Sequence, residues 1–297
     1  METKPLRVLS LFDGISCARV ALGDRPTSWY GASEIDINAI AVSFDNHSDI
    51  TPLGDVCDVS GVKDIDLLIA GSPCTDLSIA KKDRQGLKGD HSKLFYEFLR
   101  ILRETRPRYF ILENVASMKK EDRDEITKLV GVAPIMIDAS LVSAQSRKRY
   151  FWTNIAVKGL PEDRNIKLKD ILEPNVAKEF YTNTTAKRVM KEIKKATTSG
   201  VGLYSIGHLG DTNAQANRIY DTEGKACTLS ANGGGLGAKT GLYQIIKRIR
   251  KLTPIECERL QNLPDDYTKC LGKTQRYRCL GNAFNVEVIK FILSFLQ

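Results

Sequence analysis

The chain has 297 residues, of which 42% are hydrophobic and 27% charged, an ordinary composition for one large globular domain or one domain with a smaller lobe. No apolar run approaches the ~18 residues of a membrane span, and the first seven residues lack the apolar core of a signal peptide. We therefore expect a cytoplasmic or nuclear protein with no membrane partner.

The seven cysteines are an odd number, and no two of them have the Cys-x-x-Cys spacing of metal sites. The three histidines lie away from any cysteine pair. These counts predict reduced thiols and no bound metal.

The net charge of +8 is unevenly distributed. Between Ala156 and Arg250 there are 16 Lys and Arg against nine Asp and Glu, which leaves only +1 for the rest of the chain. Such a basic stretch is either a solvated face or the contact surface for a polyanion such as a nucleic acid.

The first half of the chain alternates short apolar runs with helical periodicity, which is typical of a mostly parallel sheet covered on both faces by helices. The expected strands are 7–12, 29–33, 51–56, 65–70, 109–112, 134–138 and 150–152, and the expected helices are 17–22, 92–106 and 122–129.

Polar residues follow several of these strands at the edge where open α/β sheets bind ligands. They are Asp13-Gly14, Glu34, Asp55, Pro73-Cys74 and Glu113-Asn114. An acidic residue about 20 positions after a glycine turn suits ribose hydroxyls. Cys74 at a strand end is a candidate nucleophile, although an isolated cysteine is more often a small buried hydrophobic residue.

The remaining segments are less regular. The polar stretch 75–90 is expected to be a lid, a binding loop or a disordered segment. Residues 187–195 fit a basic amphipathic helix, and 197–240 fit a lobe of loops and short strands. A helix is expected to begin at Pro254 behind the cap Thr253, and a single helix is expected over 278–297.

Eight short motifs occur in an order that resembles the cytosine-C5 DNA methyltransferase family. They are Phe12-Asp-Gly14, Glu34, Gly54-Asp-Val56, Ser72-Pro-Cys74, Glu113-Asn-Val115, Gln145-x-Arg147-x-Arg149, the run from Leu252 to Gln261, and Gly281-Asn-Ala283. The surroundings of Cys74 resemble animal de novo enzymes most, and 226–235 resembles the target-recognition region of bacterial or phage enzymes. The resemblance covers nearly the whole chain.

This resemblance implies an α/β, Rossmann-like, S-adenosylmethionine-dependent methyltransferase fold with a mostly parallel seven-stranded sheet and a small irregular target-recognition lobe. The catalytic, cofactor-binding domain would comprise 1–165 and 248–297, and the basic target-recognition domain 166–247. The partner would be double-stranded DNA. The protein would be a restriction-modification enzyme or phage orphan methylase near the nucleoid, expected as a monomer with an oligomer left open.

The implied cofactor is S-adenosylmethionine, converted to S-adenosylhomocysteine without a metal. Phe12 would lie against the adenine, Asp13 to Ile15 near the methionine moiety, and Glu34 on the ribose. The full implied cofactor set is Phe12, Asp13, Gly14, Ile15, Glu34, Ile35, Asp55, Val56, Pro73, Leu94, Asn282 and Ala283. Since Ser16 stands where most bacterial relatives have a second glycine, a slightly different turn is expected there.

The implied catalytic set is Cys74, Glu113, Asn114, Arg147 and Arg149. A thiolate that adds to C6 removes the aromaticity of cytosine and makes C5 nucleophilic. Glu113 would donate to the base as charge develops, and the two arginines would hold the target nucleotide through guanidinium hydrogen bonds.

A target base inside a duplex must leave the stack before it can react. The implied DNA contacts are Ser78, Ile79 and Lys82 in the lid, together with Gln145, Thr228, Ser230, Gly233 and Gly234. Thr75, where many relatives have Gln, bears on target choice. Which side chains contact base edges stays open.

Three alternatives compete with this interpretation. The tRNA-methylating branch of the superfamily usually carries a Cys-Phe-Thr run after Glu-Asn-Val, which is absent here. A catalytically inactive binding module would not need Cys74, Glu113 and Arg147. A nicotinamide dehydrogenase would need a Gly-x-Gly-x-x-Gly run, which the Asp13-Gly14 turn does not continue.

Overall fold

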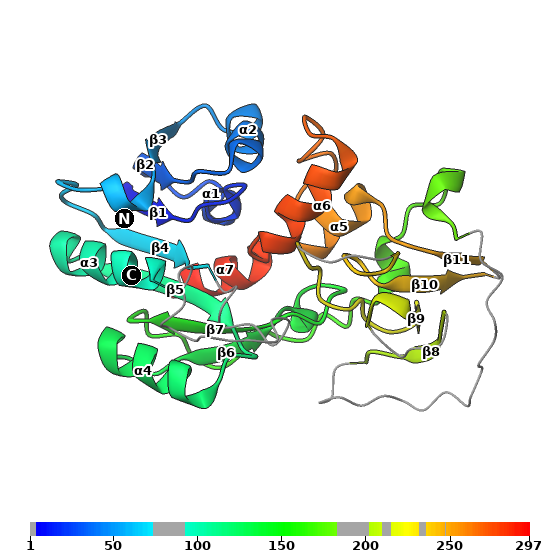
Figure 1. Cartoon of the computed structure of the whole chain (residues 1–297). Helices are drawn as coiled ribbons and strands as arrows, with labels where there is room; N and C mark the ends of the chain where they lie inside the picture. The colour runs from blue at the N-terminus through cyan, green and yellow to red at the C-terminus, as the bar shows by residue number, and fades with distance from the viewer. Residues whose placement is uncertain (1–3, 74–92, 183–201, 210–214, 232–235, 247) are drawn as a thin grey trace. The chain divides into compact units, whose positions relative to one another are not determined.

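The computed structural model describes residues 4–73, 93–182, 202–209, 215–231, 236–246 and 248–297 (Figure 1). Its contacts divide the chain into two compact units. The first unit comprises Met1–Ile137, Lys148–Leu160 and Ile289–Gln297, and the second comprises Asp138–Arg147 and Pro161–Val288. The predicted domain boundary, with 166–247 as the recognition domain, stays a prediction.

A seven-stranded sheet forms the first unit, in the order β3-β2-β1-β4-β5-β7-β6. The strands are β1 (Leu6–Leu11), β2 (Thr27–Ser33), β3 (Ile50–Gly54), β4 (Leu67–Gly71), β5 (Tyr109–Val115), β6 (Ile135–Asp138) and β7 (Lys148–Thr153). The four pairs from β3 to β5 are parallel, whereas β7 runs antiparallel to β5. The predicted mostly parallel α/β sheet is therefore confirmed.

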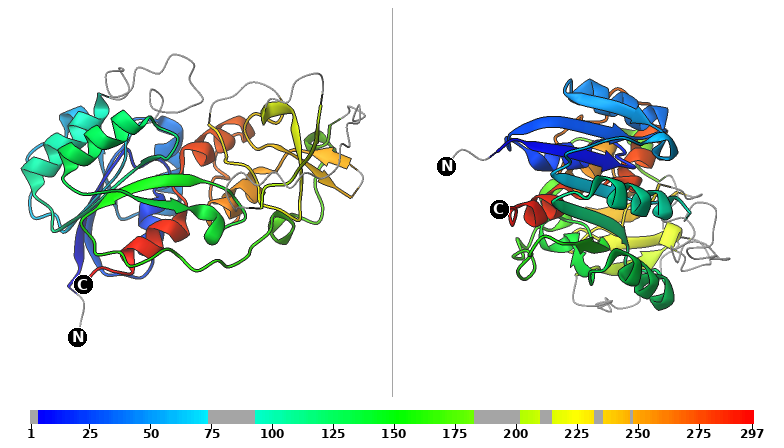
Figure 2. Two further views of the ribbon diagram at one scale, coloured as in Figure 1. Left: turned by 90° about the horizontal axis from the view of Figure 1, so that it is seen from below. Right: turned by 90° about the vertical axis from the view of Figure 1, so that its left-hand side faces the viewer.

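Side chains from both faces of the central strands are buried. On one face, Leu9, Leu68 and Leu112 form a core with Phe98 of α3 (Leu94–Thr105) and Ile126 of α4 (Lys120–Val130). These two helices lie side by side, and the left view of Figure 2 shows them on the same side of the strands. Continuous apolar runs rather than alternating ones are what a strand buried on both faces requires.

Along the chain, α1 (Cys17–Leu22) connects β1 to β2, and α2 (Ile37–Asn46) connects β2 to β3. Helix α1 has the predicted bounds. Helix α2 was not among the expected helices and begins behind Asp36, whose carboxylate accepts a hydrogen bond from the Asn38 amide. Strand β3 also ends earlier than predicted, because Asp55 caps the short 3₁₀ helix η1 (Val56–Asp58).

The second unit has a four-stranded sheet in the order β11-β10-β9-β8. Its strands are short: β8 (Ser205–His208), β9 (Arg218–Asp221), β10 (Leu242–Ile245) and β11 (Arg248–Arg250). The unit also contains turns and the 3₁₀ segments η3 (Ala139–Leu141), η4 (Leu168–Ile171), η5 (Lys178–Phe180) and η6 (Gln215–Asn217). The predicted helix over 187–195 lies outside the described residues.

Three helices follow the small sheet. Helix α5 (Pro254–Leu260) begins behind the predicted cap Thr253, which forms a capping box with Glu256. The single helix predicted over 278–297 is wrong, since the chain forms α6 (Lys273–Asn282) and α7 (Val286–Leu293). Near the end of α6, the Gln261 side-chain amide donates to the Leu280 carbonyl at 2.8 Å. Asn285 then caps the start of α7, because its side chain accepts a hydrogen bond from the Val288 amide.

Every helix in the described ranges is too short or too polar to cross a lipid bilayer.

A buried ion pair holds β11 against α5. Both Arg250 terminal nitrogens donate to the Glu256 carboxylate, at 2.7 and 2.6 Å, and the two side chains are 1% and 0% exposed. Glu256 also accepts from the amides of Thr253 and Glu173. A carboxylate with this many donors fixes three chain segments at one point.

We predict that Glu256→Gln lowers the free energy of unfolding by about 3–5 kcal/mol, because the Arg250 charge would stay buried without its counter-ion. Urea denaturation measures this loss. Glu223→Gln is the matched control, because Glu223 is an exposed partner of Lys167 and Lys169 and should change stability much less. Equal effects of the two substitutions would contradict the prediction.

Candidate active site

The carboxyl ends of five neighbouring strands in the first unit carry the predicted residues. Phe12 to Gly14 follow β1, Glu34 follows β2, Asp55 follows β3, Pro73 follows β4, and Glu113 lies near the end of β5. Since β3, β2, β1, β4 and β5 are adjacent and parallel, these residues line one edge of the sheet.

The turn after β1 is held by a buried carboxylate. Asp13 is 4% exposed and accepts hydrogen bonds from the hydroxyls of Ser10, Ser16 and Tyr30, the Ser10 and Tyr30 bonds measuring 2.5 and 2.7 Å. Burial raises the pKa of Asp13, while these three hydrogen bonds act in the opposite direction. The Asp13 side chain therefore faces the protein interior, and at this position only the backbone is available to a ligand.

The backbone of this turn takes unusual conformations. Phe12 and Ser16 have φ values of 55° and 58°, which side chains with a Cβ rarely adopt, and Gly14 has a φ of 60°. The expected difference in the turn at Ser16 thus takes the form of a left-handed residue. The hydrogen bonds to Asp13 hold Ser16 in this conformation.

Glu34 is oriented by backbone amides. One carboxylate oxygen accepts from the Gly14 amide, and the other accepts from the amides of Ile35 and Asp36, all at 2.8 Å. The neighbouring Ile35 side chain is 68% exposed. An oriented carboxylate next to an exposed apolar side chain can bind a sugar hydroxyl and a flat aromatic ring together.

The next strand end adds a second oriented carboxylate. Asp55 accepts from the Cys57 amide at 2.9 Å, and Val56 is buried. Leu94, at the start of α3, packs against the core cluster that includes Val56. The residues after β3 therefore form a short capped turn with an apolar base.

Glu113 and Arg149 form an ion pair across the β5–β7 ladder, with 2.7 Å between Nε of Arg149 and Oε1 of Glu113. Their side chains are only 15% or less exposed. On its other side, Glu113 pairs in register with Gly71, the last residue of β4. The chain reaches Cys74 three residues after Gly71, although Cys74 itself lies outside the described residues.

Asn114 fixes the segment that leads to this cysteine. Its side-chain amide is buried and donates to the hydroxyl of Ser72 at 3.0 Å and to the Ser72 carbonyl at 3.3 Å. Its carbonyl oxygen accepts from the Val115 amide. Asn114 is therefore a structural link between β5 and the residues before Pro73.

Gln145 and Arg147 belong to the second unit and are both buried. The Arg147 guanidinium donates to the carbonyls of Leu229, Gly281 and Ala283 at 3.4, 3.3 and 2.8 Å. The Gln145 amide is 0% exposed and bonds to Leu229 and Leu260. These contacts hold both side chains within the second unit, and the predicted contacts of Gln145 with DNA and of Arg147 with the target nucleotide stay predictions.

The other predicted residues of the second unit differ in their exposure. Thr228 and Ser230 are half-buried, and Asn282 is exposed, whereas Ala283 is buried. The predicted DNA contacts Ser78, Ile79, Lys82, Gly233 and Gly234 lie outside the described residues, as does Thr75.

Four polar residues that were not predicted as site residues support the turn after β1. They are Ser10, Ser16, Tyr30 and Ser43, and the hydroxyl oxygens of Ser16 and Ser43 lie 2.7 Å apart. Ser10 gave one usable signal, since a polar side chain in an otherwise apolar strand needs a buried partner. Nothing in the sequence indicated that the Tyr30 hydroxyl would meet Asp13.

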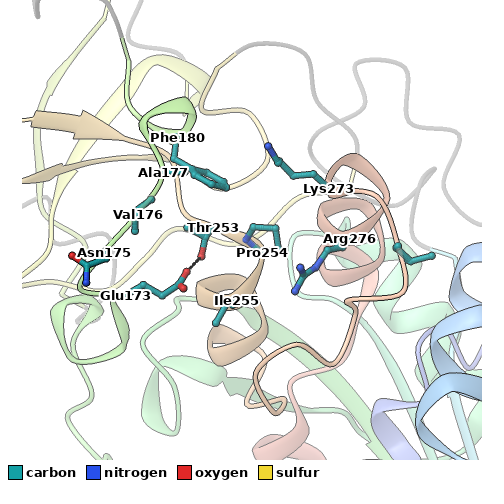
Figure 3. A pocket seen from close by; sticks show the side chains of 11 residues that line it. Glu173, Asn175, Val176, Ala177, Phe180, Thr253, Pro254, Ile255, Lys273 and Arg276 are labelled. Carbon is teal, nitrogen blue, oxygen red and sulfur yellow. Dashed lines mark hydrogen bonds between the residues drawn. The ribbon is translucent and has the colours of Figure 1, made fainter.

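A pocket of about 380 Å³ lies within the second unit, between residues 173–180 and helices α5 and α6 (Figure 3). Its charged groups have partners, since Thr253 donates to Glu173 and Lys273 lies 2.5 Å from a carboxylate oxygen of Glu179. No predicted site residue is among the described residues that line it. It is therefore separate from the strand-end site.

The family model described as C-5 cytosine-specific DNA methylase matches residues 6–297. The chain belongs to this family. The predicted family is thus confirmed, and so is its reaction, the transfer of a methyl group to C5 of cytosine in DNA. The dehydrogenase alternative is wrong.

Two curated relatives illustrate the similarity. The type II methyltransferase M.HhaI of Haemophilus parahaemolyticus is 32% identical, over 97% of this chain and 93% of the relative. The orphan methyltransferase M.Rho11sI of Bacillus phage rho11s is 28% identical, over 81% of this chain and 60% of the relative.

Solved structures agree on the fold. A methyltransferase of Entamoeba histolytica superposes with a TM-score of 0.73 at 16% identity, covering 99% of this chain and 98% of the other. The Dnmt2 methyltransferase of S. pombe gives 0.66 at 19% identity, with 97% of each chain covered. At these identities the likeness concerns the fold alone.

Because Asp13 is buried, we predict that the stability of the protein depends on pH through this carboxyl and that Asp13→Asn removes this dependence. Because the folded protein holds this proton to a higher pH than the unfolded chain, Asp13 lowers the free energy of unfolding as pH rises from 3.8 through its raised pKa. Asn keeps an oxygen for Ser10 and Tyr30. Urea denaturation at several pH values measures the free energy of unfolding of Asp13→Asn minus that of wild type. This difference should increase as pH rises across the window. A constant difference would contradict the assignment.

Proposed function

We propose that the first unit methylates C5 of a cytosine extruded from duplex DNA, with Cys74 as the nucleophile. The observation that carries this proposal is the Glu113–Arg149 pair, placed beside Gly71 and three residues from Cys74. A carboxyl and a guanidinium at one strand edge, with a thiol three residues further along the chain from Gly71, are the groups that addition to a pyrimidine requires.

The strand edge also fits the expected methyl donor, S-adenosylmethionine. The oriented carboxylates of Glu34 and Asp55 suit hydroxyl and amino donors, and the exposed Ile35 offers an apolar contact for the adenine. Phe12, the backbone of Asp13 to Ile15, Pro73 and Leu94 would complete the site. Asn282 and Ala283 of the second unit remain proposed contacts. When bound, this cofactor supplies an electrophilic methyl group on a sulfonium.

The residues of this chain would act on the base in sequence. The Cys74 thiolate would add to C6, and Glu113 would hold a proton at N3 while negative charge develops on the ring. Arg149 fixes the direction of the Glu113 carboxyl through their ion pair. Once C5 carries the methyl group taken from the sulfonium, loss of the C5 proton to a base and expulsion of the thiolate would restore the aromatic ring.

Duplex DNA is the proposed substrate. The segment 75–90, with Ser78, Ile79 and Lys82, would approach the space left by the extruded base. In the second unit, Thr228, Ser230 and the glycines at 233 and 234 would approach the DNA backbone. We further propose a cytoplasmic monomer that acts near the nucleoid.

We predict that Cys74→Ser abolishes methyl transfer and that Glu113→Gln slows it by about 10²–10⁴-fold, the usual contribution of a positioned acid or base. The assay follows labelled methyl groups from S-adenosylmethionine into unmethylated duplex DNA. DNA that contains 5-fluorocytosine should form a covalent adduct with wild type and none with Cys74→Ser. An adduct that persists in this mutant would overturn the assignment of the nucleophile.

The same assay separates the alternative functions. Methylation of tRNA but not of duplex DNA would favour the tRNA-methylating branch. DNA binding without any methyl transfer by wild type would favour an inactive binding module.

A further inference from the structure

The chain from Lys225 to Ala231, here called the 225–231 segment, belongs to the second unit and forms backbone hydrogen bonds with residues 144–146. Ala226 forms a parallel bridge with Gln145. The Ala226 amide donates to the Ala144 carbonyl at 2.6 Å, and its carbonyl accepts from the Ser146 amide at 2.9 Å. The segment thus runs alongside the residues of the Gln-x-Arg motif.

Side chains of that motif hold the middle of the segment. The Leu229 amide donates to Oε1 of Gln145 at 3.0 Å, and the Leu229 carbonyl accepts from Arg147 at 3.4 Å. Both backbone groups of one residue are therefore bound by buried side chains.

The far end of the segment lies directly against α6. A Cβ atom added to Gly281 would lie 2.3 Å from the Ala231 backbone nitrogen, far inside contact distance. The segment and the helix therefore touch backbone to backbone.

The near end of the segment is held by a buried ammonium group. Lys225 is 8% exposed, and its Nζ donates to the carbonyls of Ser140, Ser143 and Ile166 at 2.6, 3.1 and 2.6 Å. An ammonium has three donors, and each has a carbonyl here. Burial lowers the pKa of Lys225, which means that the charge is held at a cost in solvation.

We infer that Lys225 is a positioning residue for DNA recognition, acting through the 225–231 segment. The segment carries Thr228 and Ser230 and leads directly into the glycines at 233 and 234, so this inference rests on the proposed function for the identity of the ligand. Three carbonyls from two separate stretches of chain accept hydrogen bonds from the one ammonium group of Lys225. If the ammonium group is removed, each of these carbonyls loses that hydrogen bond. The start of the segment then loses its anchor.

The test compares Lys225→Met, which keeps the length of the side chain without its donors, with wild type. We expect the KM for unmethylated plasmid DNA to rise about tenfold, with kcat and S-adenosylmethionine affinity nearly unchanged. Hydrogen exchange of the full-length chain should be about tenfold faster in peptides that cover 225–231.

Lys169→Met is the matched control, because it removes one positive charge from the same unit, and the Lys169 side chain pairs with the exposed Glu223. It should leave both measurements at wild-type values. If Lys225→Met fails to fold, Lys225→Gln keeps two of the donors and should show a smaller change in the same direction.

The outcomes are distinct. Wild-type exchange and KM in a folded Lys225 variant would overturn the inference, and so would faster exchange with an unchanged KM for DNA. A wild-type protein that is inactive on duplex DNA would overturn the proposed function instead, and the exchange data would still decide whether Lys225 holds the segment.

Discussion

The pairing of β4 with β5 is the constraint on which the candidate site depends. Its parallel register sets Gly71 beside Glu113, and the antiparallel β5–β7 ladder sets Arg149 beside Val115, within reach of Glu113. A shift of one residue would turn Glu113 to the opposite face of the sheet and away from Arg149.

Buried polar groups in this protein serve to fix irregular backbone. Asp13 holds a turn in which Phe12, Gly14 and Ser16 have positive φ, and the half-buried Glu34 accepts from three backbone amides. In the second unit, Glu256 and Lys225 do the same for chain segments that lack regular structure. A charge buried with several hydrogen bonds is costly to disturb, which makes it suitable for holding loops that must keep one shape.

Local signals predicted most strands and helices of the first unit. Apolar runs marked the strands, and Thr253 with Pro254 marked the start of α5. The break between α6 and α7 has a local part, the cap Asn285, and a remote part that the sequence does not show, the bond from the Gln261 side chain to the Leu280 carbonyl. The antiparallel direction of β7 was equally hidden, because strand direction depends on the path of the connection and leaves no mark in the strand itself.

The sequence by itself determined the fold class and the family and predicted the candidate reactive side chains, because strand ends and motif order are local properties of the chain. Only the tertiary structure decided how those side chains are used. Arg147 belongs to the same motif as Arg149, yet Arg147 binds carbonyls up to 136 positions away, whereas Arg149 pairs with Glu113. A buried guanidinium takes whichever acceptors folding brings to it, and no local pattern specifies these.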